Sequence, residues 1–139
     1  MLTTPLIHPP LLEALAKAGH GSKILIADGN YPFATATGPN TTTVWLNVSP
    51  GLLTVDQVLG VLTQVLTFEA GHTMRDESDQ IAPPHAGYQR AIGRNLAIES
   101  TSRFDFYDLA RGEDLAVLIA TGDQRRCANL LLTVGVRTP

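Results

Sequence analysis

The sequence has 139 residues, the length of one ordinary domain, and its net charge is −3 because acidic residues outnumber basic ones. Nucleic acids and anionic lipids are bound by patches of lysine and arginine, so this charge excludes both as expected partners. A hydrophobic share of 44% predicts a globular protein with a rather apolar surface, part of which further copies of the chain would cover.

The first half of the chain alternates between helical and extended patterns. Apolar residues recur at helical spacing after Pro9-Pro10, and Gly19 follows them, as glycine follows many helix ends. Thr54 and Gln57 are placed as a capping box before the clearest helical pattern. The predicted elements are helices over 9–18 and 55–68 and strands over 23–27 and 41–48.

The second half repeats this alternation with shorter patterns. Ser102 is placed to cap a helix, and Arg111-Gly112 is placed to end it. Helices that alternate with short, wholly apolar strands indicate an α/β fold. The sequence therefore predicts a single layered domain over 1–139, with a central, mainly parallel sheet and helices on both faces. The predicted elements of this half are strands over 72–75, 96–99, 115–120 and 130–136, a helix within 83–95 and a helix over 102–110.

Polar residues stand where such a fold places its ligands, which bind beyond the carboxyl ends of the strands. Asp28 directly follows a predicted strand, and the loop that ends at Asn129 follows another. Each candidate also has an ordinary structural explanation. For each residue taken alone, that explanation is favoured over a functional role. Asp28 and Asn129 suit turns. Arg103 suits a solvated surface, and His20 suits the end of the first helix, where histidine often caps carbonyl groups.

The motifs give little support to a nucleotide-binding site or a metal site. The Gly-His-Gly at 19–21 follows a predicted helix and precedes a strand, whereas phosphate-binding loops have the reverse order. The histidines show no spacing typical of a metal site, and a site assembled only in three dimensions stays open. We therefore expect a protein without cofactor or metal.

The single cysteine, Cys127, cannot form an internal disulfide and carries no local motif of an activated thiol. An isolated thiol is typical of a reducing compartment. The N-terminal residues show no leader pattern, and no segment approaches the roughly 20 apolar residues that a membrane helix requires. These features predict a cytoplasmic protein without a membrane partner.

The segments LLEALAKAGHGSKILIADGNYP, SRFDFYDLARGEDLAVLIATGD and CANLLLTVGV span nearly the whole chain. In this order they resemble the RbsD/FucU family of sugar mutarotases. The resemblance is closest to the fucose mutarotase branch, whose A-D-x-N-F-P element is similar to residues 27–32 and whose R-F-x-F-Y element is similar to residues 103–107. The ribose pyranase branch usually has a histidine near the position of Arg103.

The resemblance implies an isomerase that interconverts anomers or ring forms of a free monosaccharide without a cofactor. By the same resemblance His20 would be the proton donor. Asp28, Arg103 and Asn129 would bind the sugar hydroxyls. Many family members form ring-shaped decamers with sites between neighbouring subunits, which implies a homo-oligomer. Cys127 stands in the substrate-binding motif where the family has tyrosine, and a thiol is a weaker hydrogen-bond donor than a phenol.

The separation of His20 and Asp28 along the chain predicts a site that two subunits share. In an extended chain they would lie up to about 26 Å apart, far more than a monosaccharide spans. We therefore expect a neighbouring subunit to complete the pocket. The expected substrate is an L-fucose-like sugar. The alternatives are D-ribose pyranase activity, a sugar-binding protein without turnover because Cys127 replaces the tyrosine, and a purely structural ring protein.

Overall fold

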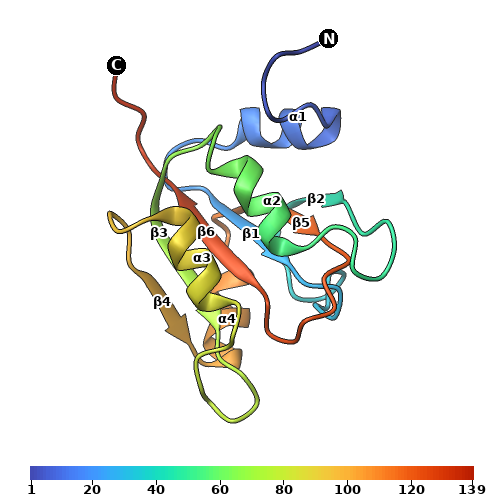
Figure 1. Cartoon of the computed structure of the whole chain (residues 1–139), viewed down its shortest axis with the longest axis vertical. Coiled ribbons are helices and arrows are strands. Elements are labelled where there is room, and N and C mark those ends of the chain that lie inside the picture. The colour runs from blue at the N-terminus through green and yellow to red at the C-terminus, as the bar shows by residue number, and fades with distance from the viewer.

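Six strands form one sheet in the order β2-β5-β1-β6-β3-β4 in the computed structural model, which describes residues 1–139 (Figure 1). The strands are β1 (Lys23–Ala27), β2 (Thr42–Trp45), β3 (Phe68–Met74), β4 (Ile98–Thr101), β5 (Leu115–Ala120) and β6 (Leu130–Val134). The helices are α1 (Pro9–Lys17), α2 (Val55–Leu62), α3 (His85–Ile92) and α4 (Arg103–Ala110).

All strands except β6 run in the same direction. Strand β5 pairs in parallel with β1 and β2, and β3 pairs in parallel with β4. Strand β6 lies antiparallel between β1 and β3. The predicted mainly parallel sheet is therefore confirmed. One edge of the sheet gathers the carboxyl ends of five strands and the beginning of β6.

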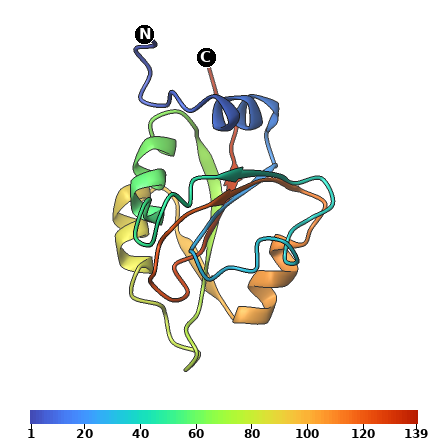
Figure 2. The ribbon, with the colours of Figure 1, turned by 90° about the vertical axis from the view of Figure 1, so that its right-hand side faces the viewer.

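Helices cover both faces of the sheet, as the sequence predicts. Alternate residues of β1 point to opposite faces, because side chains alternate along a strand. Ile24 and Ile26 join the apolar cluster that includes residues of α1, α2 and α3. Leu25 and Ala27 join the second cluster, to which α4 contributes Phe106. Figure 2 shows α2 and α3 on one side of the sheet and α4 on the other.

Helix α2 begins where its capping box predicts, with both hydrogen bonds of the box present, but it ends at Leu62 rather than at residue 68. Val65 and Leu66 continue the apolar pattern because they pack against the same core. They do so from tight turns, in which Gln64 and Val65 donate to carbonyls three residues back. The chain can therefore enter β3 at Phe68, four residues before the predicted strand.

The remaining boundaries differ little from prediction. Strand β1 has the predicted bounds, and α4 starts directly after Ser102, whose hydroxyl accepts a hydrogen bond from the main-chain N–H of Asp105. Strand β4 begins at Ile98, because its pairing with β3 sets its ends and its own short apolar pattern does not. None of the four helices has the length and apolar character that crossing a bilayer demands.

Candidate functional site

A pocket of about 230 Å³ lies at the edge of the sheet where the parallel strands end, and all predicted site residues except His20 line it. Asp28 directly follows β1, and Asn129 directly precedes β6, which lies beside β1. Arg103 is the first residue of α4, which follows β4 after one residue. The sheet therefore brings together residues that are far apart in sequence. The other lining residues are Asn30, Tyr31, Met74, Glu77, Tyr107, Arg126 and Cys127.

The carboxylate of Asp28 is buried and held by the main chain. Its side chain accepts hydrogen bonds from the main-chain N–H of Asn30 at 2.9 Å and of Ala128 at 3.0 Å, one on each oxygen. Burial raises the pKa of Asp28, although these two donors act in the opposite direction. Each oxygen keeps a further lone pair, so the carboxylate can also accept hydrogen bonds from a ligand.

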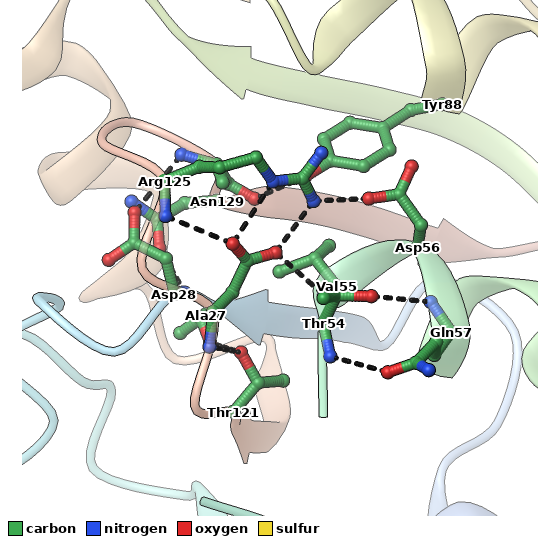
Figure 3. A network of polar contacts seen from close by, with 12 residues as sticks. Ala27, Asp28, Thr54, Val55, Asp56, Gln57, Tyr88, Thr121, Arg125 and Asn129 are labelled. Carbon is green, nitrogen blue, oxygen red and sulfur yellow. Dashed lines mark hydrogen bonds and ion pairs between the residues drawn. The ribbon is translucent and has the colours of Figure 1, made fainter. Parts of the chain in front are cut away.

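The side-chain amide of Asn129 is oriented by the main chain of Asp28. Its Oδ1 accepts a hydrogen bond of 2.8 Å from the main-chain N–H of Asp28, and Figure 3 shows the two residues side by side. The amide nitrogen is therefore the donor end, and it lies 4.0 Å from the sulfur of Met74. The pocket thus has a buried acceptor, Asp28, next to a neutral donor.

The exposed Arg103 and the half-buried Tyr107 form one wall of the pocket. Arg103 donates from Nε to the Tyr107 hydroxyl at 3.3 Å, and its guanidinium carbon lies 5.6 Å from the centre of that ring. The hydrogen bond raises the pKa of Arg103, which stays a cation. Because these residues are four apart on α4, they meet on one face of the helix.

Cys127 lies in the pocket in a left-handed backbone conformation, with φ of 55°. This conformation is uncommon for a residue with a side chain, and it aims the next N–H, that of Ala128, at Asp28. Burial raises the pKa of the half-buried Cys127, so the thiol stays protonated near neutral pH. Cys127 therefore offers a neutral and weak hydrogen-bond donor.

His20 does not lie in the pocket. It sits at the opposite edge of the sheet, between α1 and β1, with its side chain 57% exposed. Its Nε2 lies 2.9 Å from a carboxylate oxygen of Glu69 in β3. The ring thus pairs with Glu69 and not with a carbonyl of α1, so the capping alternative is wrong. Within one chain the structure does not bring His20 and Asp28 together.

A network around Asp123 supports the loop that carries Cys127 and Asn129 (Figure 3). Asp123 is 1% exposed and accepts hydrogen bonds from the main-chain N–H of Val55 and from the guanidinium of Arg125, at 3.0 and 2.6 Å. Burial acts to raise the pKa of Asp123, but these hydrogen bonds outweigh it and hold the pKa below its usual range. The network ties the loop to the beginning of α2, a contact between distant segments that sequence patterns do not reveal.

Replacing Asp123 with asparagine is expected to lower the free energy of unfolding by about 1–3 kcal/mol, because a buried main-chain donor and the Arg125 pair lose their partner. The difference from wild type should shrink as the pH falls below about 4, where the unfolded chain binds the proton first and the native carboxylate then follows. Urea titrations at several pH values measure both effects. Asp56→Asn is the matched control, since Asp56 is a half-exposed partner of the same Arg125. Equal losses of unfolding free energy in the two variants would contradict the role of Asp123 as the buried centre of this network.

Comparisons with known proteins show the family and the fold of this chain. The model of the RbsD / FucU transport protein family matches residues 1–137. The D-ribose pyranase of Paracidovorax citrulli is 29% identical over 136 residues, which cover 98% of each chain. The structure of Bacillus subtilis RbsD complexed with D-ribose has a TM-score of 0.82 at 24% identity, and it covers 99% of this chain and 100% of its own. Streptococcus pneumoniae fucose mutarotase in complex with L-fucose has a TM-score of 0.83 at 23% identity, with the same coverage. These two structures have the same fold as this chain.

Proposed function

The chain belongs to the RbsD/FucU family of sugar mutarotases and pyranases, and from this premise we propose that it opens and recloses the ring of a free aldose, with an L-fucose-like sugar preferred. The family and the isomerase class that the sequence predicts are confirmed. The observation that carries the proposal is the buried carboxylate of Asp28, which main-chain N–H groups hold in place. It lies beside the side-chain donors Arg103 and Asn129 in a pocket of monosaccharide size. D-ribose pyranase activity is the second candidate, because a relative of nearly equal length bears that name.

The donors and acceptors of the pocket suit neutral sugar hydroxyls. The Asp28 carboxylate accepts hydrogen bonds from hydroxyl groups, and such bonds to a charged acceptor are the stronger kind. The guanidinium of Arg103 and the amide nitrogen of Asn129 donate to sugar oxygens. Asp28 and Arg103 have opposite charges, so the pair favours no charged substituent on the sugar. These three residues would fix the ring in one orientation.

Ring opening requires two proton movements. A base removes the proton of the anomeric hydroxyl while an acid gives a proton to the ring oxygen. The bond between the anomeric carbon and the ring oxygen breaks, the anomeric C–O becomes a carbonyl group, and the ring oxygen becomes a hydroxyl group. Reclosure on the other face of the carbonyl yields the other anomer. An imidazole suits this exchange near neutral pH, and His20 is the proposed proton donor. Because His20 lies at the opposite edge of its own chain, we propose that a neighbouring protomer supplies it in a ring-shaped homo-oligomer.

Exchange NMR tests the proposed function. The purified protein is added in catalytic amount to equilibrated aldoses that include L-fucose and D-ribose, and anomeric and ring-form exchange rates are measured. Faster exchange for L-fucose than for D-ribose supports the full proposal, whereas the reverse order selects the pyranase. Calorimetric sugar binding with unchanged exchange rates would select a binding protein. Neither binding nor exchange would leave only a structural role.

Sugar binding is expected to weaken at mildly acidic pH because the pKa of Asp28 is raised by burial. Protonation removes the charge that the sugar hydroxyls bind, so the affinity should fall as the pH drops below the pKa of Asp28 in the free protein. That pKa lies above the value of about 3.9 of an ordinary aspartate. Calorimetric titrations from pH 7 to pH 4 measure the midpoint. An affinity that stays constant over this range would contradict the expected role of Asp28.

A further inference from the structure

A second pocket of about 350 Å³, the side pocket, adjoins the pocket of Asp28, the sugar pocket. It lies between the segment that follows β3 and the loop that precedes β6. Glu77, Arg126 and Cys127 line both pockets, so the two spaces are neighbours. The other residues that line the side pocket are Asp76, Ser78, Pro83, Pro84 and Arg125.

The boundary between the two pockets is formed by side chains that leave room for a ligand. Cys127 is half-buried, and its side chain is a single CH₂–SH group that fills little space. Arg126 pairs with Glu77 across the boundary at 2.8 Å, but its side chain is 77% exposed and can take other rotamers. A group attached to a sugar in the first pocket can therefore extend past Cys127 into the second.

The arginines of the side pocket are already paired with carboxylates. Arg125 donates to the buried Asp123 at 2.6 Å and also pairs with Asp56. Arg126 pairs with Glu77. A phosphate or carboxylate group on the ligand would have to compete with these partners, and it would be repelled by them. The side pocket therefore favours a neutral substituent.

The remaining lining suits a sugar ring. The main-chain N–H groups of Ser78 and Gln80 donate to the same oxygen of Asp76, Oδ1, at 2.8 and 2.9 Å, so Oδ2 is left for hydroxyl groups of a ligand. Pro83 and Pro84 add apolar ring atoms, on which the C–H groups of a sugar can pack. The side pocket is larger than the sugar pocket of about 230 Å³, so a whole second ring has room there.

We propose that the side pocket binds the second, neutral sugar unit of a reducing disaccharide whose reducing unit lies in the sugar pocket. This proposal rests on the proposed function and names a substrate class for it. Ring opening needs a free anomeric hydroxyl, so the unit beside Asp28 is the reducing one. The second unit is joined to one of its other hydroxyl oxygens, and the glycosidic bond stays intact throughout.

Calorimetry and exchange NMR on the purified protein test the substrate class. The sugars are L-fucose, D-ribose and their D-galactosyl derivatives, each joined at one non-anomeric oxygen, with D-ribose 5-phosphate as the charged comparator. The disaccharide with the best linkage is expected to bind about 10-fold more tightly than its monosaccharide, because the second ring adds hydrogen bonds. Its reducing end should show catalysed anomeric exchange. D-ribose 5-phosphate should bind no more tightly than D-ribose.

Variants of the side pocket locate the gain. Ser78 lines the side pocket alone, so Ser78→Trp should fill it, remove the 10-fold gain and leave monosaccharide exchange unchanged. Ser78→Ala is the matched control, which keeps the space and should keep most of the gain. At the boundary, Cys127→Phe should lower the ratio of disaccharide to monosaccharide affinity about 10-fold, whereas the smaller Cys127→Ser should keep it.

The outcomes separate this proposal from the proposed function. Monosaccharides that exchange faster, with disaccharides that bind no more tightly, would overturn the side pocket and support the mutarotase. A gain that survives Ser78→Trp would also overturn the side pocket, and so would D-ribose 5-phosphate that binds more tightly than every disaccharide. A disaccharide that binds more tightly without faster exchange would support the side pocket and contradict the mutarotase activity. If no sugar binds or exchanges, both proposals are overturned.

Discussion

Replacing His20 with alanine is expected to slow anomeric exchange by about 100- to 10,000-fold, the contribution of a positioned proton donor. Protein folding should change little, because the side chain is 57% exposed and its one partner, Glu69, is itself half-exposed. Exchange NMR measures the rate, and sedimentation compares the assembly of the variant with that of wild type. Calorimetry should find sugar still bound, since His20 does not line the pocket of its own chain.

Mixed assemblies test whether a neighbour supplies the imidazole. His20→Ala and Asp28→Asn are both expected to have much lower activity than wild type. Co-assembled subunits would contain some sites with an intact His20 from one chain and an intact Asp28 from the other. Recovery of activity on mixing supports a shared site. The matched control mixes Asp28→Asn with Arg103→Gln, because both side chains line the pocket of a single chain and every such site stays defective.

Two results would contradict the role of His20. A wild-type exchange rate in His20→Ala would leave the residue with only its surface contact to Glu69. Full loss without recovery on mixing, in assemblies shown to contain both chains, would contradict the site between subunits. The second result would require another way to bring His20 to the sugar, because the two edges of the sheet lie a full strand apart.

Replacing Asp28 with asparagine is expected to weaken sugar binding by about 10- to 100-fold, because the strong hydrogen bonds to a charged acceptor are lost. The amide also disturbs the site, since it presents an NH₂ group to the main-chain N–H of either Asn30 or Ala128. One of these donors then loses its acceptor, and the free energy of unfolding should fall by about 1–3 kcal/mol. Calorimetry and urea titration measure the two effects.

A matched control separates the effect of the Asp28 charge on affinity and stability from the effect of changing the net charge of the protein. Asp108 lies exposed on α4, outside the pocket, so Asp108→Asn should keep the wild-type affinity and change stability by less than about 0.5 kcal/mol. The affinity of Asp28→Asn should also lose its dependence on pH between 7 and 4. An Asp28→Asn variant with wild-type affinity would contradict the role of this carboxylate.

Local patterns predicted most elements because their signals lie within one segment. Strand β1 has its predicted bounds, since a wholly apolar run suits a strand that is covered on both faces. The hydroxyl of Ser102 and the capping box at Thr54 mark the first turns of α4 and α2. The end of α2 was predicted wrongly, because Val65 and Leu66 reach the core from turns and so continue the helical pattern beyond the helix.

The sequence by itself determined the family, the mainly parallel sheet with helices on both faces, and four of the ten residues that line the pocket, because these depend on residue type and on short spacings. Only the tertiary structure decided which residues meet. Asp28 and Ala128 are joined across 100 positions, Asp123 is tied to α2 across 68, and His20 is placed at the far edge of the sheet. The physical reason is that strand order and direction bring distant segments together, and no local pattern encodes that order.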